Sequence, residues 1–252
     1  MTKRTPLIAG NWKLNNTIAE SKALAGALAA HVGTGLGCEV VVAPVATSFA
    51  AVKQSLEGSA VGLAAQNTHW EDSGAWTGEL SPTLLLDAGC NYCIIGHSER
   101  RQFFGETDEG VRKKVGALLV HKVVPILCVG ETLEQREAGK TLDVVLGQID
   151  AATEGYDAVA LAPLVVAYEP IWAIGTGITA SPQQAQDVHA FIRKLIAKQD
   201  PGVAELVRIQ YGGSMNAGNA AELLAMPDID GGLIGGASLN SEDFLTICRA
   251  AG

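Results

Sequence analysis

The sequence predicts an α/β fold, a (β/α)8 barrel of eight parallel strands, on the basis of three observations. Eight short runs rich in Val, Ile and Leu recur along a chain of 252 residues, and helix-like stretches separate them. The average spacing between these runs is about thirty residues, the length of one βα unit. A chain of this length is typical of a closed barrel made of eight such units.

The eight apolar runs are the predicted strands. Runs this continuous indicate strands buried on both faces, as in a parallel sheet covered by helices. An open, doubly wound sheet shows the same alternation and is the alternative fold. No linker, low-complexity segment or block of charge divides the chain, so we expect residues 1–252 to form one domain. The runs cover residues 6–11, 39–43, 60–65, 92–96, 123–129, 164–168, 206–211 and 231–235.

The stretches between the strands carry helix start signals. Residues 17–20 form a Thr-x-x-Glu capping box, and Ser-Pro pairs at 81–82 and 181–182 place proline at a first helical position. Residues 184–199 repeat apolar side chains at helical spacing. These signals predict helices after the first, third and sixth strands.

One segment, Gln66 to Ser81, interrupts this alternation. It is mostly polar, contains glycine and carries two tryptophans, Trp70 and Trp76. Long loops in compact domains are usually functional, and tryptophans left in water are unfavourable. We therefore expect this loop to dock on another surface.

Composition narrows the class of protein. Hydrophobic residues make up 48% and charged residues 18% of the chain, and the net charge is −9. This charge argues against nucleic acid and against an anionic membrane surface as partners. No stretch resembles a signal peptide or a membrane span, so a cytoplasmic location is expected.

The five cysteines point to the same compartment, because their number is odd and most lie in apolar runs. Cys90 and Cys93 form a CxxC string that precedes a predicted strand, whereas a redox pair starts a helix. No second ligand pair accompanies it. We expect neither a redox pair nor a metal site there.

Polar side chains gather where the predicted strands end. Asn11 and Lys13 follow the first strand, His97 and Glu99 follow the fourth, and Glu169 follows the sixth. The spacing of two within each pair predicts a shared face. In barrels the chemistry lies at the C-terminal strand ends, so this set predicts proton abstraction beside a carbonyl, with donors for the developing oxyanion.

Two glycine-rich turns suggest an anchor for an anionic substrate. The strings GGS at 212–214 and GG at 235–236 close the seventh and eighth strands, where barrels commonly bind phosphate. Without a Cβ atom, the backbone N–H groups can approach an anion closely.

The string GxGxxA at 175–180 imitates a dinucleotide motif. It does not directly follow a strand, and no acidic residue is suitably placed after it, so no NAD site is expected.

The motifs together resemble the triosephosphate isomerase family. The strings AGNWKLN, IIGHSERR, CVGE, AYEPIWAIGTG, QYGGSMN and LIGGASL occur in this order, from Ile8 to about Leu239. The resemblance implies a homodimeric, cofactor-free TIM barrel in glycolysis and gluconeogenesis. Such an enzyme interconverts dihydroxyacetone phosphate and D-glyceraldehyde 3-phosphate.

The resemblance also implies roles for individual residues. Glu169 would be the base, His97 the electrophile that polarises the carbonyl, Lys13 the stabiliser of negative charge, and Asn11 an orienting group. The implied phosphate-binding residues are Asn11, Lys13, Gly175, Ser214, Gly235 and Gly236.

The stretch after Glu169 is the implied lid. Its proline end is stiff, its glycine end is free, and its centre is apolar. The lid residues are Pro170, Ile171, Trp172, Ala173, Ile174, Gly175, Thr176 and Gly177.

The resemblance also implies a role for the 66–81 loop in the homodimer. Its Thr77 would reach the active site of the second subunit.

Two other functions remain as alternatives. A Schiff-base aldolase would use Lys13 as its nucleophile, but a nearby carboxylate and phosphate would keep that amine protonated. A barrel that only binds phosphorylated metabolites would keep the glycine turns. It would have no need for Glu169 and His97 together.

Overall fold

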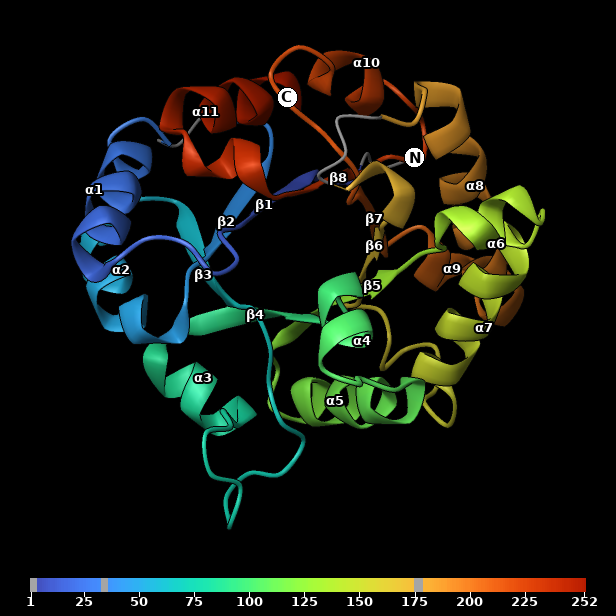
Figure 1. The fold of residues 1–252 in the computed structure, drawn as a ribbon, viewed down its shortest axis with the longest axis horizontal. Helices are drawn as coiled ribbons and strands as arrows, with labels where there is room; N and C mark the ends of the chain where they lie inside the picture. The colour runs from blue at the N-terminus through green and yellow to red at the C-terminus, as the bar shows by residue number, and fades with distance from the viewer. Residues whose placement is uncertain (1–3, 33–35, 175–178) are drawn as a thin grey trace.

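The strands form a closed parallel barrel surrounded by helices, as Figure 1 shows. The computed structural model describes residues 4–32, 36–174 and 179–252. The strands pair in sequence order from β1 to β8, and β1 pairs with β8 to close the ring. The barrel prediction is confirmed. The open doubly wound sheet is wrong, because such a sheet has two free edges.

The strands lie close to their predicted positions. They are β1 (Leu7–Asn11), β2 (Glu39–Ala43), β3 (Val61–Ala65), β4 (Cys90–Ile95), β5 (Val124–Val129), β6 (Val165–Tyr168), β7 (Arg208–Tyr211) and β8 (Gly231–Ile234).

The α-helices form the outer ring. They are α1 (Ile18–Ala29), α2 (Phe49–Ser55), α3 (Pro82–Ala88), α4 (Ser98–Phe103), α5 (Asp108–Val120), α6 (Leu133–Glu137), α7 (Thr141–Thr153), α8 (Pro182–Gln199), α9 (Pro201–Ala204), α10 (Ala220–Leu224) and α11 (Ser241–Ala250). The described residues also form 3-10 turns after β2, β6 and β8, namely η1 (Ala46–Ser48), η2 (Ile171–Ala173) and η3 (Gly236–Leu239).

The predicted helix starts are confirmed. Thr17 and Glu20 make the reciprocal capping box of α1. The side chains of Ser81 and Ser181 cap α3 and α8, and each of these helices has proline in its first turn. Each capping side chain accepts a backbone N–H that would otherwise have no partner in the helix.

Successive side chains of each strand point to opposite faces of the barrel wall and so belong to two separate hydrophobic cores. Leu7 and Ala9 of β1, like Val165 and Ala167 of β6, belong to the core inside the barrel. The residues between them, such as Ile8 and Val166, belong to the larger core between strands and helices. Because side chains alternate along a strand, positions 11 and 169 continue the inward series. This register directs both polar residues toward the mouth of the barrel.

The prediction for the CxxC string was wrong in one respect. β4 begins at Cys90 and not at residue 92, so Cys90 lies within the strand together with Cys93. Both thiols are buried, and burial raises the pKa of Cys90 to about 12 and that of Cys93 higher still. Groups of three or more His, Cys, Asp or Glu placed to hold a metal do not occur among the described residues.

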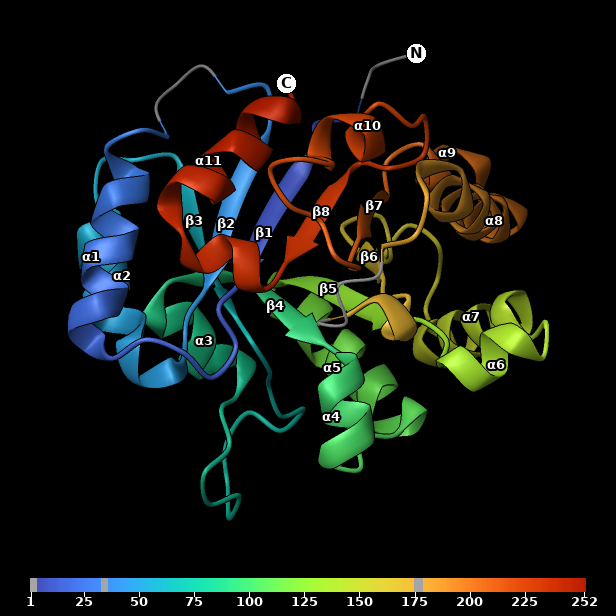
Figure 2. The ribbon, with the colours of Figure 1, turned by 45° about the horizontal axis from the view of Figure 1, so that its top comes forward.

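The 66–81 segment projects from the molecule between β3 and α3, as the teal loop in Figures 1 and 2. Its two tryptophans differ. Trp70 is half-buried and stacks on His69 at 4.2 Å, with the ammonium of Lys113 5.1 Å from its ring. Trp76 keeps 49% of its surface exposed. The expectation that both tryptophans need an external surface therefore applies to Trp76 alone.

Within the described part of the chain, no helix is both long enough and apolar enough to cross a bilayer.

Candidate active site

A cavity of about 260 Å³ opens at the C-terminal end of the barrel. Its wall comes from the ends of β6, β7, β8 and β1, which are neighbours in the barrel, and from the end of β4 across the mouth. The predicted site residues that line it are Asn11, Lys13, His97, Glu169, Ser214, Gly235 and Gly236. The structure thus brings together the predicted residues that it describes at this end. Their chemical roles stay predictions.

Glu169 is a buried carboxylate at the base of this cavity. It follows the inward-facing Ala167 by two positions, and its own side chain is 2% exposed. The backbone around it is fixed, because Glu169 N–H donates to the carbonyl of Val129 at 2.7 Å. A Cβ atom on Gly130 would overlap the carbonyl oxygen of Glu169, so glycine is required beside it.

Two donors hold the carboxylate of Glu169. Its Oε2 atom accepts the backbone N–H of Ser98 at 3.0 Å, and its Oε1 atom lies 3.0 Å from Nε2 of His97. Both donors lie where β4 leads into α4, with His97 in the turn and Ser98 as the first residue of the helix. Gly96 makes this turn, with a φ of +68° that a side chain would strain.

His97 caps the N-terminus of α4, and this position fixes its tautomer. Its Nδ1 atom accepts the backbone N–H of Glu99 at 3.2 Å. The Nδ1 atom therefore carries no proton, and the proton of the neutral ring lies on Nε2. Nε2–H then points at Glu169 and at the cavity.

The two groups shift each other's pKa. Burial raises the pKa of Glu169, but His97, the Ser98 N–H and Lys13 together outweigh burial and hold the pKa below its usual range. Burial lowers the pKa of His97, whereas the carboxylate of Glu169 raises it, and the net direction is upward. The hydrogen bond that Nδ1 accepts from the Glu99 backbone N–H opposes protonation of the imidazole. We therefore assign a carboxylate and a neutral imidazole near neutral pH.

Lys13 reaches the cavity by a route that the spacing of two did not predict. β1 ends at Asn11, and Lys13 has a left-handed backbone with φ of +52°. The Oδ1 atom of Asn11 accepts the Lys13 N–H at 3.0 Å, and Gln66 donates to the Lys13 carbonyl at 2.9 Å. The predicted shared face of a strand was wrong, although Asn11 and Lys13 do line the same cavity.

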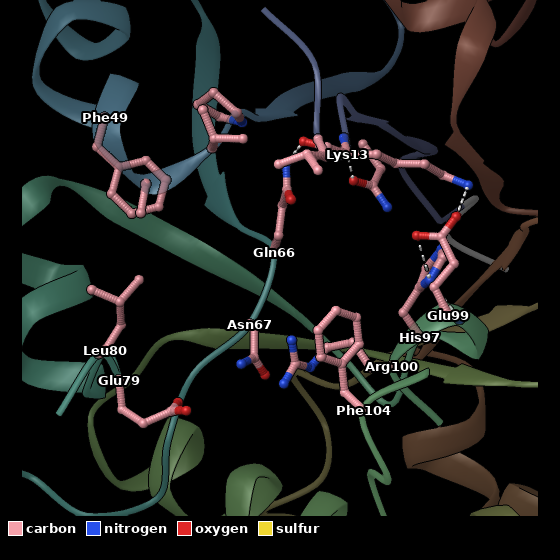
Figure 3. Close-up of a pocket in the computed structure, with 16 residues that line it drawn as sticks. Lys13, Phe49, Gln66, Asn67, Glu79, Leu80, His97, Glu99, Arg100 and Phe104 are labelled. Carbon is pink, nitrogen blue, oxygen red and sulfur yellow. Dashed lines mark hydrogen bonds and ion pairs between the residues drawn. The ribbon is translucent and has the colours of Figure 1, made fainter. Parts of the chain in front are cut away.

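The same correction applies to His97 and Glu99. Both follow the end of β4 at Ile95 and lie at the start of a helix, not on a strand face. Glu99 accepts the ammonium of Lys13 at 2.6 Å, as Figure 3 shows. Sequence reasoning had noted Glu99 without a role. Its contact with Lys13 spans 86 residues and has no local signal.

The glycine turns form the opposite wall of the cavity. A Cβ atom on Gly212 would lie 2.9 Å from Cγ of Glu169, so this turn lies directly against the carboxylate. Gly235 and Gly236 lead into η3 beside Lys13. Gly175, Thr176 and Gly177, predicted for the lid and for phosphate binding, lie outside the described residues.

The described part of the predicted lid, Pro170 to Ile174, contains the turn η2. Ala173 is buried and Ile174 lines the cavity. Trp172 donates to Glu131 at 2.9 Å and lies under the guanidinium of Arg136 at 4.4 Å.

Glu131 is the residue that sequence reasoning missed. Its carboxylate is fully buried, and it also accepts the hydroxyl of Tyr168 at 3.1 Å. Its carbonyl accepts the N–H of Ile171 at 3.1 Å. The available signal was a carboxylate directly after the fifth strand and its glycine, in the string CVGE.

A second cavity, of about 490 Å³, adjoins the first and shares Asn11, Lys13 and His97 with it. Figure 3 shows it between the 66–81 loop and the side chains of Arg100 and Phe104. Phe104 is 68% exposed, and Leu14, on the same cavity wall, is 93% exposed. This cavity is open and partly apolar.

Comparison with known proteins gives one family. The sequence model described as "Triosephosphate isomerase" matches residues 6–251. A protein of that name from Syntrophotalea carbinolica is 54% identical over 247 residues, which cover 98% of each chain. Those from Chlorobium luteolum and Pelobacter propionicus are 55% and 52% identical over 250 residues. The alignments cover 98% and 99% of this chain, and 99% and 100% of those proteins, respectively.

Proposed function

The chain belongs to the triosephosphate isomerase family, and we propose on that premise that Glu169 is the base of its proton transfer. The reaction is the interconversion of dihydroxyacetone phosphate and D-glyceraldehyde 3-phosphate in glycolysis. One observation carries the assignment of the base. The Glu169 carboxylate lies 3.0 Å from Nε2 of a neutral imidazole, and both groups border the same cavity.

In this mechanism Glu169 removes a proton from the carbon next to the carbonyl, and the electron pair moves to the carbonyl oxygen. Nε2–H of His97 donates to that oxygen as negative charge develops, so its hydrogen bond passes from Glu169 to the substrate. Lys13 stabilises the same charge, and Asn11 orients the substrate. Glu169 then returns the proton to the neighbouring carbon, while the hydroxyl proton on the adjacent oxygen moves to the former carbonyl oxygen and leaves the new carbonyl behind. No cofactor enters the cycle.

The phosphate end of the substrate is assigned to the glycine wall. The backbone N–H groups of Gly235 and Gly236 and the hydroxyl of Ser214 are its proposed donors, together with Gly175 and the ammonium of Lys13. Support comes from the position of Gly235, where an added Cβ atom would lie 3.4 Å from Cε of Lys13. A dianion bound there meets both neutral donors and a cation.

A coupled isomerase assay with each triose phosphate tests the function directly. The wild-type protein is expected to turn over both triose phosphates. The Glu169→Gln variant is the matched control and should lose this activity. Borohydride reduction in the presence of substrate distinguishes the aldolase alternative. Covalent capture of substrate on Lys13 would overturn the isomerase mechanism, and binding without turnover would leave only the metabolite-binding alternative.

We also propose that residues 170–177 act as a lid. Trp172 and Ile171 attach its first half to Glu131. Closure would exclude water and so suppress loss of phosphate from the enediolate. Deleting residues 171–174 should slow isomerisation severely and increase the share of turnover that releases phosphate and methylglyoxal. Slower turnover without extra phosphate would contradict the protective role.

We propose that the protein is a homodimer and that the second cavity forms part of the interface between its subunits. In this dimer the 66–81 loop of one subunit, with exposed Trp76 and Thr77, would enter the open cavity that Leu14 and Phe104 line on the other. Thr77 would then approach Asn11 and Lys13 of the partner subunit. Light scattering at assay concentrations should show a dimer, and activity should fall as dilution separates the subunits. A fully active monomer would contradict this assembly.

The remaining proposals follow from composition and family. We place the protein in the cytoplasm, with a second role in gluconeogenesis, and treat residues 1–252 as one domain. Nucleic acid and membranes are not proposed as partners, since the net charge is −9.

A further inference from the structure

Two of the five cysteines lie together at the N-terminal end of the barrel, opposite the active site. Cys38 directly precedes β2, and Cys248 lies in the last turn of α11. α11 runs antiparallel to the strands, so its end returns to the point where β2 begins. Figure 2 shows the end of α11 beside the blue segment that enters β2.

The contact between the two residues is direct. The Sγ atom of Cys38 lies 3.3 Å from the carbonyl oxygen of Cys248. Because a carbonyl oxygen lies about 2.4 Å from the Cα atom of its own residue, this sulfur is within about 6 Å of the Cys248 Cα. The two thiols also shift each other's pKa, downward for Cys38 and upward for Cys248.

The backbone on both sides of the pair is held. Gly37 N–H donates to the carbonyl of Gly252 at 3.1 Å, and an added Cβ atom on Gly37 would lie 2.8 Å from that oxygen. Ala251 N–H donates to the Cys248 carbonyl at 3.2 Å. These bonds keep the segment before β2 against the end of α11, so the thiols stay adjacent.

The two thiols are unequal. Cys38 is partly exposed, and Cys248 is fully buried. The neighbouring Cys248 thiol lowers the pKa of Cys38, although burial opposes this. The Cys38 thiol and burial together raise the pKa of Cys248. The accessible sulfur is therefore also the better nucleophile.

We propose that Cys38 and Cys248 form an oxidisable pair that a hydroperoxide converts into a disulfide joining β2 to α11. The Cys38 thiolate attacks one peroxide oxygen, the O–O bond breaks, and hydroxide leaves to give a sulfenic acid. The sulfur of Cys248 then attacks the Cys38 sulfur, the S–O bond breaks, and the Cys248 proton leaves with that oxygen as water. Two thiols are oxidised, and one hydrogen peroxide is reduced to two waters.

Such a bond would stabilise the fold. The pair is 210 residues apart in sequence, so the disulfide closes a loop containing most of the chain. Cross-linking a long loop restricts the unfolded chain and raises stability. For a protein of this size we expect Tm to rise by about 5–15 °C, reversibly on addition of dithiothreitol.

The test treats the whole protein with hydrogen peroxide, alkylates the remaining thiols and maps the products by mass spectrometry. The reduced chain has five thiols, and the oxidised chain should retain three alkylated ones, Cys90, Cys93 and Cys128. A cross-linked peptide pair containing Cys38 and Cys248 is expected, with the rise in Tm measured by calorimetry. Cys38→Ser should abolish both results, and Cys90→Ala should preserve the cross-link.

Several outcomes would overturn the proposal. They are an unchanged thiol count, over-oxidation of Cys38 with Cys248 still reduced, a Cys38–Cys38 bond between two chains, or a disulfide that lowers Tm. Cys38→Ser replaces a partly exposed side chain, so it avoids the cavity that Cys248→Ala would leave. If Cys248→Ala also folds, peroxide should stop at oxidised Cys38 in that variant. A disulfide of Cys38 with another cysteine there would contradict the assigned partner.

Discussion

Both ends of the barrel hold a carboxylate paired with a nitrogen group, but the two pairs have different surroundings. At the N-terminal end, Glu39 accepts the guanidinium of Arg208 at 2.6 Å and the hydroxyl of Tyr92 at 2.5 Å. At the C-terminal end, Glu169 contacts His97 and the Ser98 N–H, both at 3.0 Å, beside a cavity.

The difference lies in whether the partners can be exchanged. Glu39, Tyr92 and Arg208 form a closed triangle, because Arg208 also donates to Tyr92 at 3.1 Å. Each group is already matched, and the cluster closes the base of the barrel. His97 and Glu169 instead border a cavity, and in the proposed mechanism each exchanges the other for the substrate. A charged pair supports the fold when its partners are fixed, and it supports chemistry when a ligand can replace one of them.

The largest effect should come from His97→Gln. An amide can still donate a hydrogen bond, but it does not reproduce the position of Nε2–H. We expect kcat to fall by about 10²–10⁴-fold with little change in unfolding free energy. Steady-state kinetics and urea denaturation measure the two quantities. A kcat close to that of the wild type in the folded variant would remove His97 from the mechanism.

The second prediction concerns His189, a buried histidine outside the site. Burial lowers its pKa to about 4, although the Asp228 carbonyl, 3.1 Å from Nδ1, and the Asp228 carboxylate oppose this. Between pH 6.5 and 4 the unfolded chain binds a proton that the folded chain does not. Stability should therefore fall as pH falls through this window, by on the order of 3 kcal/mol.

The matched variant is His189→Gln, compared with wild type by urea denaturation at several pH values. It should flatten the loss of stability between pH 6.5 and 4, and its kcat at pH 7.5 should stay within a few-fold of wild type. An unchanged pH slope would assign the loss to other groups.

Sequence reasoning identified the strands because they are buried on both faces, so their apolar runs do not depend on distant contacts. It also placed Asn11 and Glu169 at the mouth of the barrel, since a strand alternates its side chains. It failed where one segment constrains another. The left-handed Lys13 depends on Gln66, and Glu131 acquires its contacts from Tyr168 and Trp172.

The tryptophans of the 66–81 loop show the same limit. Nothing in the loop itself distinguishes Trp70 from Trp76. Lys113 of α5 lies against the Trp70 ring, and this contact exists only once the fold has formed. Local pattern therefore predicted the positions of the elements, whereas tertiary contacts decide which polar or aromatic groups are covered.

The smallest effect is expected for Arg208→Met at the base of the barrel. The substitution removes the guanidinium and keeps much of the apolar volume. Glu39 is 40% exposed and can be hydrated, so the loss should be about 1–2 kcal/mol of unfolding free energy. Urea denaturation measures the loss, and kcat should not change. A large fall in kcat would mean that the two ends are coupled.

The most direct test shortens one carboxylate at each end by a single methylene and compares Glu169→Asp with Glu39→Asp. A displacement of roughly 1 Å in a reacting group can reduce the rate by on the order of 10²-fold. The account predicts that Glu169→Asp lowers kcat at least that much while the protein stays folded. Glu39→Asp should lose only about 1 kcal/mol of stability and keep its kcat. Near-normal kcat in folded Glu169→Asp, or equal losses of kcat in both variants, would contradict Glu169 as the base.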